Sequence, residues 1–562
     1  MEVPDRAGSV SETATGIRPA WKAAAAYAVY QAITVVVWVL PAWSRFTHEN
    51  MLAGRQDSRY FQWALAWTPW ALLHHLNPLH DPFLFAPTGV NLAWSTFVPG
   101  PAIVMWPVTE LFSPVTSLNL IKAAAPALAG WAAYLVCHRL TGRFWPSVVG
   151  GYLFGFSAYT QGSIPFVNLV LVFPIPLLVY VVVRRVEGSI GSVAFVAGFA
   201  ALLVGLFSIS TELFGTTAIF GAIAFGGALV VGREIRRELL GTLRLIALAG
   251  AIAAVALLPY LVAVVSTAPS EPLHGSPFAM PPWGFVIPSA WMALGGDRFL
   301  AFTQRLTLHP NGSGLGYLGL ALLALLGFAI TERRRAATWA LLGFVAFVSI
   351  VALGPTLTVG GRSFGLMPQR LMLRAPFMSS AVPARFTLYS ALAVGVIVAL
   401  WLARAAGRWA WVRWAVAVAA CLSLFPARPN TPPPQQVPAF ISSSELPQVL
   451  GDHENVFAIG IQRGDEMLWQ ATAGFRFDLA QGYIGVVPRE LWTGQLSRGL
   501  SLLRSKPPPA DAFRAWLEQH EVSAVLLADQ ARPVYGSMLS DAGLEPVFSG
   551  GGASVWRWEQ VP

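Results

Sequence analysis

Long apolar segments recur along the chain and constrain its fold more than any other feature. A helix needs about 20 mostly apolar residues to cross a bilayer. Eleven segments approach this length: 24–41, 118–138, 146–162, 166–184, 190–209, 213–232, 242–265, 315–331, 337–355, 386–404 and 408–425. Only 12% of the residues are charged and 55% are hydrophobic, and that charge is roughly half of what a globular domain carries. The sequence therefore predicts a polytopic membrane protein and excludes an ordinary soluble enzyme.

Arginines in the short loops predict the orientation of these helices. The loops contain Arg139, Arg143, Arg184, Arg185, Arg233, Arg236, Arg237, Arg333, Arg334, Arg335, Arg404 and Arg408. If residues 1–23 form a cytoplasmic tail, eleven crossings place all of these loops in the cytoplasm, as the positive-inside rule requires. The net charge of +9 is then a topology signal, and we expect no nucleic-acid partner. Outside lie residues 42–117, 267–314, 356–385 and everything after 425.

Two segments of the first outer loop, 59–76 and 97–112, leave their relation to the membrane open. Trp63, Trp67 and Trp70 recur at helical spacing in the first segment, which is typical of a helix lying in the interface. The same stripe is equally typical of aromatic side chains packed inside the protein. We expect both segments to lie on or dip into the membrane.

The C-terminal part changes character after a Pro-rich linker at 426–441. NVFAIGI, SAVLLAD and ASVWRWE have the pattern of strands, and ADAFRAWLEQHEV that of an amphipathic helix. We therefore expect a small α/β domain at 442–562, outside the membrane. The chain contains no Walker A, G-x-G-x-x-G, G-x-S-x-G or H-E-x-x-H motif, so common ATPase, dehydrogenase, hydrolase and zincin functions are excluded.

Ionisable side chains gather in the first outer loop, although the whole chain has only 28 acidic residues and 9 histidines. Asp57 comes just before the Trp-rich segment. It is a candidate catalytic carboxylate, or alternatively the cap of that helix. Glu49 and Asp81 are secondary candidates in the same loop. Glu212, in SISTELF at the outer end of a membrane segment, is another, because ionisable groups near membrane depth are often functional; solvation at the interface is the alternative.

A cluster of arginines in the outer loop 356–385 opposes the positive-inside tendency. Its members are Arg362, Arg370, Arg374 and Arg385. Guanidinium groups suit bidentate binding of phosphate. They also reach lipid headgroups without any specific ligand. Four outward arginines in one short loop favour an anionic ligand on that face.

Four stretches of the chain resemble a known superfamily. DSRYFQWALAW, LNPLHDPFLFAPTGVNLAWST, HRLTGRFWPSVVGGYLFGFSAY and VPARFTLYSAL are similar to a group of bacterial membrane proteins assigned to the GT-C superfamily of integral membrane glycosyltransferases. The resemblance covers residues 24–425 and, more weakly, the tail. It implies a mainly α fold: a transmembrane bundle of about 11–13 helices with a small extracytoplasmic α/β C-terminal domain.

The resemblance also implies a site. Asp57 takes the position of the acidic residue in the first outer loop, where it is a base or sits beside a divalent cation, and the donor is a sugar on a polyprenyl phosphate. Arg374 or Arg385 would hold the donor phosphate. The chain departs from the group where it has GRQDS instead of a G-T-D-P-like sequence, and where Pro165 to Asn168 replace a G-H-like pair. No D-x-D follows Tyr159 either. These departures weigh against a metal-dependent reaction and weaken the catalytic interpretation itself, so the metal stays undetermined.

Three functions remain after this comparison. The first is a glycosyltransferase that moves a sugar from a polyprenyl-phosphate donor to a cell-envelope acceptor outside the cell membrane. The second is a transporter or flippase of lipid-linked sugars, which would need polar groups in the helices and favours internal repeats; we find few of the former beyond Lys122 and Glu212, and none of the latter. The third is a non-catalytic scaffold that presents the C-terminal domain.

Overall fold

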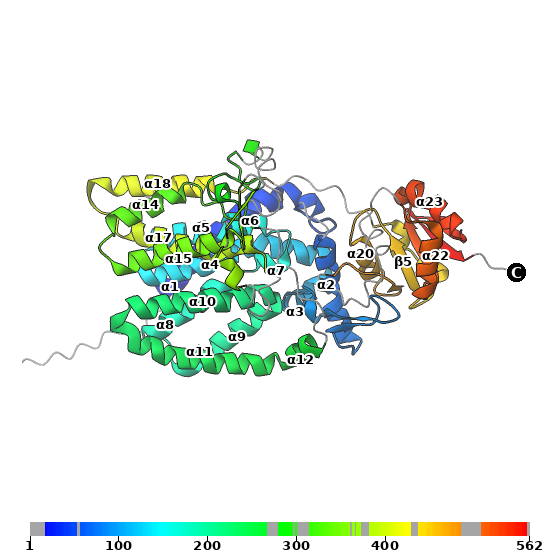
Figure 1. Ribbon diagram of the computed structural model, residues 1–562, viewed down its shortest axis with the longest axis horizontal. Coiled ribbons are helices and arrows are strands. Elements are labelled where there is room, and N and C mark those ends of the chain that lie inside the picture. The colour runs from blue at the N-terminus through cyan, green and yellow to red at the C-terminus, as the bar shows by residue number, and fades with distance from the viewer. Residues whose placement is uncertain are drawn as a thin grey trace, which may run out of the picture.

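A computed structural model describes residues 17–52, 57–266, 279–295, 298–299, 314–359, 362–365, 367–372, 381–428, 437–484 and 507–558. The molecule has a bundle of long helices at one end and a smaller part built around a β-sheet at the other (Figure 1). Two helices of the first loop, α2 (Asp57–Leu73) and α3 (Pro99–Leu111), lie where these two parts meet.

Seven helical segments of the described chain are long and apolar enough to cross a membrane. They are Ala20–Arg45 with most of α1 (Ile17–Thr34), α4 (Pro114–Thr141), Val167–Val186 with α7 (Val167–Val170) and α8 (Pro174–Val186), α9 (Ser192–Ile209), α10 (Thr211–Val231), Arg233–Ala256 with α11 (Arg236–Ala256), and Pro383–Ala403 with α17 (Thr387–Ala403). Shorter apolar helices are α5 (Phe144–Gly155), α12 (Leu258–Ser266), α14 (Ala321–Thr331), α15 (Ala336–Ala352) and α18 (Ala410–Ser423).

Four of the eleven predicted membrane segments thus form helices shorter than predicted, and local capping explains one of them. The segment 146–162 is divided because the Ser157 hydroxyl accepts a hydrogen bond from the Thr160 amide at 3.3 Å and starts a new helix, α6 (Ala158–Gly162). The segment 315–331 becomes helical only at Ala321, after a turn in which Gly319 has a φ of +56°.

Helix α4 is the centre of the bundle and packs on α1, α5, α8 and α17. Glycines let the backbones of these helices approach closely. A Cβ on Gly155 would lie 2.5 Å from the carbonyl oxygen of Pro126 in α4. A Cβ on Gly395 in α17 would lie 2.5 Å from the carbonyl oxygen of Gly150 in α5. Since lipid gives apolar helices little reason to associate, such close backbone contact stabilises the bundle.

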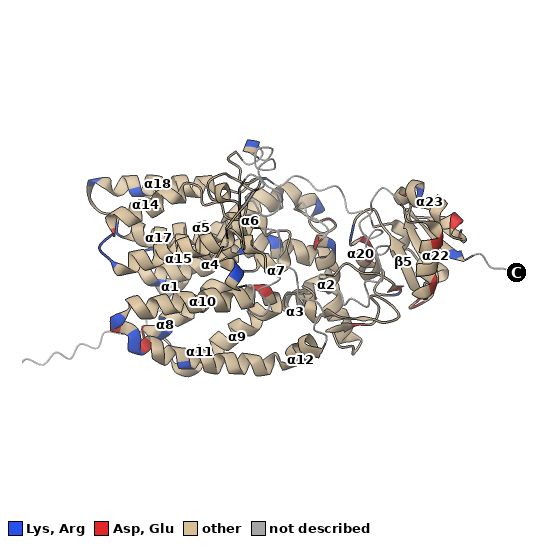
Figure 2. Ribbon diagram, in the orientation of Figure 1, with Lys and Arg blue, Asp and Glu red and all other residues tan. Residues whose placement is uncertain are grey.

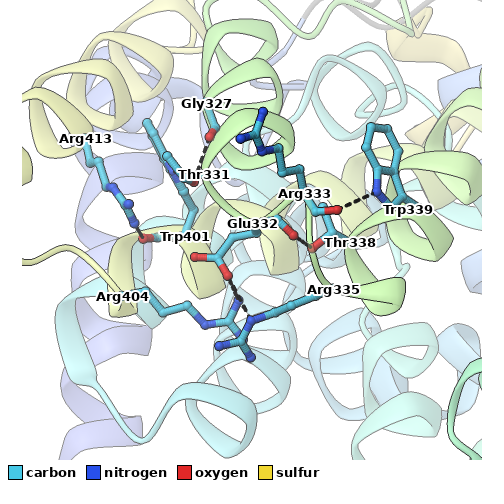
Figure 3. Close-up of polar contacts among 10 residues, drawn as sticks. All are labelled: Gly327, Thr331, Glu332, Arg333, Arg335, Thr338, Trp339, Trp401, Arg404 and Arg413. Atoms are coloured by element: carbon cyan, nitrogen blue, oxygen red, sulfur yellow. Dashed lines mark hydrogen bonds and ion pairs between the residues drawn. The ribbon is translucent and has the colours of Figure 1, made fainter.

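Basic residues gather at the end of the bundle that is far from the C-terminal sheet (Figure 2). One set of contacts there ties two interhelical loops together (Figure 3). The Glu332 carboxylate forms ion pairs with Arg335 at 3.1 Å and with Arg404 at 3.0 Å. The Arg413 guanidinium lies over the Trp401 ring and donates to the Trp401 carbonyl at 2.9 Å. These contacts join the α14–α15 loop to the loop between α17 and α18.

The C-terminal part is a five-stranded mixed sheet with the order β6-β5-β7-β9-β8. Its strands are β5 (Asn455–Ile459), β6 (Asp478–Leu479), β7 (Ala524–Ala528), β8 (Leu544–Gly550) and β9 (Ala553–Trp558). Strands β6 and β7 run parallel to β5, whereas β9 pairs antiparallel with β7 and β8. The longer helices of this part are α20 (Asp465–Thr472), α22 (Ala510–Gln519) and α23 (Arg532–Asp541). The α/β character predicted for the tail is confirmed.

The first loop extends this sheet beyond its last strand. After the short hairpin of β1 (His80–Asp81) and β2 (Val90–Asn91), which encloses the segment 83–86, the Leu479 amide donates to the Phe83 carbonyl at 2.7 Å. The Ala86 amide in turn donates to the Leu479 carbonyl at 3.0 Å. The edge of the sheet is therefore covered by a segment almost 400 residues earlier in the chain.

The Trp stripe of α2 packs inside the protein, which corrects the expectation of a helix lying in the membrane interface. Trp63 and Trp67 are fully buried. Their rings stack on each other with 5.8 Å between centroids, and both meet the ring of Phe475 from the C-terminal part. One apolar core runs from α2 through the first loop into the sheet. The other segment of the first outer loop, predicted at 97–112, forms α3, which packs on α2 and α4 but leaves Val104 and Leu111 exposed.

Candidate functional site

The candidate catalytic residue, Asp57, is the first residue of α2 and is partly exposed. A carboxylate is favourable there because the N-terminus of a helix carries partial positive charge. The apolar face of α2 is fixed against the C-terminal part by its buried tryptophans, so the start of the helix is held at the boundary between the two parts. At this boundary the Tyr483 hydroxyl donates a hydrogen bond to Asp57 Oδ1 at 3.0 Å.

Tyr483 is the donor in this contact because its phenol stays protonated. Burial raises the pKa of Tyr483 above its usual value, and the neighbouring Asp57 carboxylate raises it further. The Arg463 guanidinium lies over the ring of Tyr483, 5.1 Å from its centroid. The contact uses one carboxylate oxygen and leaves Oδ2 of Asp57 without a hydrogen-bond partner among the described residues.

A buried ion pair locks the start of α2 to the C-terminal part. Arg59 Nε lies 2.5 Å from Asp465 Oδ1, and the two side chains are 6% and 5% exposed. The other oxygen of Asp465 accepts the amides of Ile461 at 2.9 Å and Gln462 at 2.8 Å. Burial raises the pKa of Asp465 and the Arg59 charge opposes this rise. Only glycine fits at position 460, because a Cβ added to Gly460 would lie 2.4 Å from the Asp465 Cβ.

Lys122 of α4 also contacts the start of α2. Its side chain is fully buried. Its Nζ donates to Asn50 Oδ1 at 2.8 Å and to Ser58 Oγ at 3.2 Å. Ser58 follows Asp57 directly, so this lysine links the bundle to the residue next to the candidate base.

Glu212 and Arg385, which the sequence offered as separate candidates, meet each other. Arg385 Nη1 donates to Glu212 Oε2, and Glu212 Oε1 accepts the Val382 amide at 3.2 Å. Glu212 stands in the first turn of α10, and Arg385 lies immediately before α17. Both side chains keep some exposure, 19% and 25%. Arg385 is therefore oriented by the Glu212 carboxylate through Nη1, and its side chain keeps some exposure.

Among the described residues, no hydrogen bond or ion pair joins Asp57 to Glu212, Arg385, Glu49 or Asp81. Glu49 lies 3.8 Å from Arg45, one helical turn earlier. Asp81 is fully buried where the first loop meets the sheet: Oδ1 accepts the Phe83 amide at 2.7 Å, whereas Oδ2 is buried without a partner. Burial raises the pKa of Asp81 to about 7. Arg374 lies outside the described residues.

The described side chains around Asp57 do not form a site for a divalent cation. No three His, Cys, Asp or Glu side chains of the described chain come together in a way that could hold a metal ion. Asp57 itself faces a protonated phenol, and the nearby Asp465 is already paired with Arg59. We therefore assign no step of a reaction to a metal.

Sequence reasoning missed the residues that the C-terminal part brings to Asp57, namely Tyr483, Arg463 and Asp465. They are 400 or more residues away in the chain, and no short motif joins them to the first loop. Arg59 carried a weak signal, because a buried charge on the tryptophan-rich helix needs a partner. Lys122 carried another, as a lone cation in an apolar segment.

No protein-family model and no curated protein matches the chain. Solved structures do. The arabinofuranosyltransferase AftD from Mycobacteria matches with a TM-score of 0.57 at 14% identity over 96% of this chain, which spans 40% of the AftD chain. An oligosaccharyltransferase from Archaeoglobus fulgidus, tethered to an acceptor peptide, matches with a TM-score of 0.48 at 14% identity over 96% of this chain and 74% of its own. ArnT from Cupriavidus metallidurans, bound to undecaprenyl phosphate, matches with a TM-score of 0.45 at 11% identity; the match covers 95% of this chain and 98% of the ArnT chain.

The match to AftD shows the fold of the chain. Together with the apolar helices, it establishes a multi-pass membrane protein with the fold of the GT-C glycosyltransferases. The resemblance seen in the sequence is thus confirmed at the level of the fold.

Proposed function

We propose that the protein is a membrane glycosyltransferase that moves a sugar from a polyprenyl-phosphate donor to a cell-envelope acceptor on the outer face of the cell membrane. The observation that carries this proposal is Asp57, a partly exposed carboxylate at the start of α2 in a GT-C fold, with one oxygen held by Tyr483 and the other without a hydrogen-bond partner among the described residues. Such a carboxylate suits the removal of a proton from an acceptor hydroxyl.

In the proposed reaction Asp57 Oδ2 takes the proton of the acceptor hydroxyl. The hydroxyl oxygen forms a bond to the anomeric carbon of the sugar, and the bond from that carbon to the lipid phosphate oxygen breaks. The phosphate leaves with the electron pair. Arg385, oriented by Glu212, and Arg374 are proposed to stabilise the charge on the departing phosphate. Similarity to an arabinofuranosyltransferase supports sugar transfer as the reaction class.

The proposed orientation places the N-terminus in the cytoplasm and the C-terminal domain outside. The basic end of the bundle lies far from the C-terminal sheet (Figure 2). Because basic loops favour the cytoplasm, this arrangement supports a site on the outer side of the membrane, next to the α/β domain.

The transporter and scaffold alternatives receive less support from the described contacts. Lys122 and Glu212, the polar groups that a transporter would use inside the membrane, are engaged in holding Asn50, Ser58 and Arg385. A scaffold gives no reason to keep a carboxylate available at the boundary of the two parts.

The test is an Asp57→Asn variant introduced into a strain that lacks the native protein. Asparagine caps a helix about as well as aspartate, but it cannot accept the proton, so transfer should fall about 10²–10⁴-fold. Sugars of the cell envelope and of the lipid extract are compared at equal protein level, with Asp452→Asn, an exposed aspartate of the C-terminal domain, as the matched control. Wild-type transfer by Asp57→Asn, or an unchanged sugar content in the deletion strain, would refute the proposal.

A further inference from the structure

The contact between Asp57 and Tyr483 joins residues that are 426 positions apart. Asp57 belongs to the first loop, whereas Tyr483 follows β6 in the C-terminal sheet. The hydroxyl can be positioned only when the C-terminal domain is docked on α2. The site is therefore built from both parts of the molecule.

Five further contacts fix the part of the C-terminal domain that presents Tyr483. The Arg59–Asp465 ion pair is buried and lies two residues after Asp57 on α2. Trp63 Nε1 donates to Gln470 Oε1 at 3.1 Å, and Gln470 Nε2 donates to the carbonyls of Phe83 and Phe477, both at 3.1 Å. The Tyr483 amide lies 3.2 Å from the sulfur of Met467, a buried residue of α20.

Arg463 adds a charge beside this hydroxyl. Its guanidinium covers the Tyr483 ring, and its Nε is buried without a hydrogen-bond partner. The acids that follow it in the chain are committed elsewhere: Asp465 to Arg59, and Glu466 to the Gly464 amide at 3.0 Å. The ring of Tyr483 is thus held between a cation on its face and a carboxylate on its hydroxyl.

We propose that Tyr483 is a positioning residue for the glycosyl transfer, and that the docked C-terminal domain selects which oxygen of Asp57 acts as the base. This inference rests on the proposed function of Asp57. The phenol occupies Oδ1 and fixes the rotation of the carboxylate, so that Oδ2 faces the acceptor hydroxyl. A loose carboxylate would present its oxygens in many orientations, and misplacement of a reacting group is costly in rate.

The experiment is a double-variant cycle with Asp57→Asn, Tyr483→Phe and the combination of the two. Each variant is the full chain in membranes of the deletion strain. The probe is the lipid extract of that strain, labelled by growth on ¹⁴C-glucose, and the readout is label transferred to envelope material. A hydrogen bond to a charged group contributes enough that Tyr483→Phe should lower the maximal rate about 10–100-fold. The amount of extract that gives half the maximal rate should not change, because the phenol does not bind the donor.

Tyr260→Phe is the matched control. Its hydroxyl also makes a hydrogen bond of 3.0 Å, but to the Ala93 carbonyl and not to Asp57. We expect this variant to transfer within about twofold of the wild type, since losing one neutral hydrogen bond affects mainly stability. Protein level and thermal unfolding of all variants are measured in the same membranes.

The combined variant distinguishes positioning from a structural role. If Tyr483 acts through Asp57, the combination should be no slower than Asp57→Asn alone, because the two residues act on one proton. Losses that multiply would overturn the inference, as would a wild-type maximal rate for Tyr483→Phe while Asp57→Asn is slow; the proposed function would survive both results. A wild-type rate for Asp57→Asn would overturn the proposed function and this inference together.

Discussion

Removing the positive charge from the Arg59–Asp465 pair should loosen the C-terminal domain from α2. Both side chains are almost fully buried. An Arg59→Met variant keeps much of the side-chain volume but leaves the Asp465 carboxylate buried with only its two backbone amide donors. Breaking a buried ion pair in this way costs about 3–5 kcal/mol, so the docked state should lose that much relative to the undocked one.

Hydrogen–deuterium exchange measures this loss directly, because the amides of Leu479 and Ala86 are bonded between the first loop and the sheet. A loss of 3–5 kcal/mol corresponds to exchange on the order of 10²–10⁴ faster wherever undocking limits exchange. The control is Arg476→Met, whose ion pair with Asp452 is exposed and contributes little.

The pH dependence of the Arg59→Met effect follows from the charge that remains. With Arg59 gone, only the Ile461 and Gln462 amides still oppose the effect of burial on Asp465, so its pKa rises further. At low pH the carboxyl takes a proton and the penalty shrinks, so the difference from the wild type should be larger at pH 8 than at pH 5. Equal exchange of Arg59→Met and wild type at the Leu479 and Ala86 amides at pH 8 would refute the reasoning.

Three further predictions concern other parts of the molecule. Burial raises the pKa of Asp81 to about 7, above its usual 3.8, so Asp81 contributes fully to stability below pH 4 and loses this contribution as the pH rises through 7, a change on the order of 4 kcal/mol. Asp81→Asn should therefore flatten the dependence of thermal stability on pH between pH 4 and 8; an unchanged dependence would contradict the raised pKa of Asp81. Glu332→Gln should weaken the contacts with Arg335 and Arg404 (Figure 3) and lower stability by about 1 kcal/mol, seen as a lower unfolding midpoint; an equal midpoint would show the cluster to be unimportant. Reporter fusions after residue 187 should read cytoplasmic and after residue 440 exterior, and the reverse pattern would overturn the proposed orientation.

Hydrophobic length and charge were enough to predict the general fold from the sequence. Apolar segments must become helices in a bilayer because their backbone groups have no other partner there. Helix ends were less predictable, since they depend on local caps such as Ser157. The strands of the tail, for example β7 and β9, were visible because short apolar runs lay between turn signals.

The candidate site was predictable only in part. Asp57 stood out because a carboxylate at the start of a tryptophan-rich helix is unusual in so apolar a chain. Its partner Tyr483 could not be found, because nothing local ties a tyrosine to a residue 426 positions away. The stripe of Trp63 and Trp67 has the same spacing whether it faces lipid or protein, and the covering residue, Phe475, lies in another part of the chain.

The segment 83–86 that closes the sheet has a consequence for synthesis of the chain. The ribosome completes this segment and α2 long before β5 and β6 exist, so their unpaired backbone groups and uncovered tryptophans must wait for the last hundred or so residues. Such open edges and apolar faces invite aggregation. A nascent chain that stops before residue 484 would leave them exposed permanently. We therefore expect chains truncated within the C-terminal domain to be degraded, although every membrane helix is already in place.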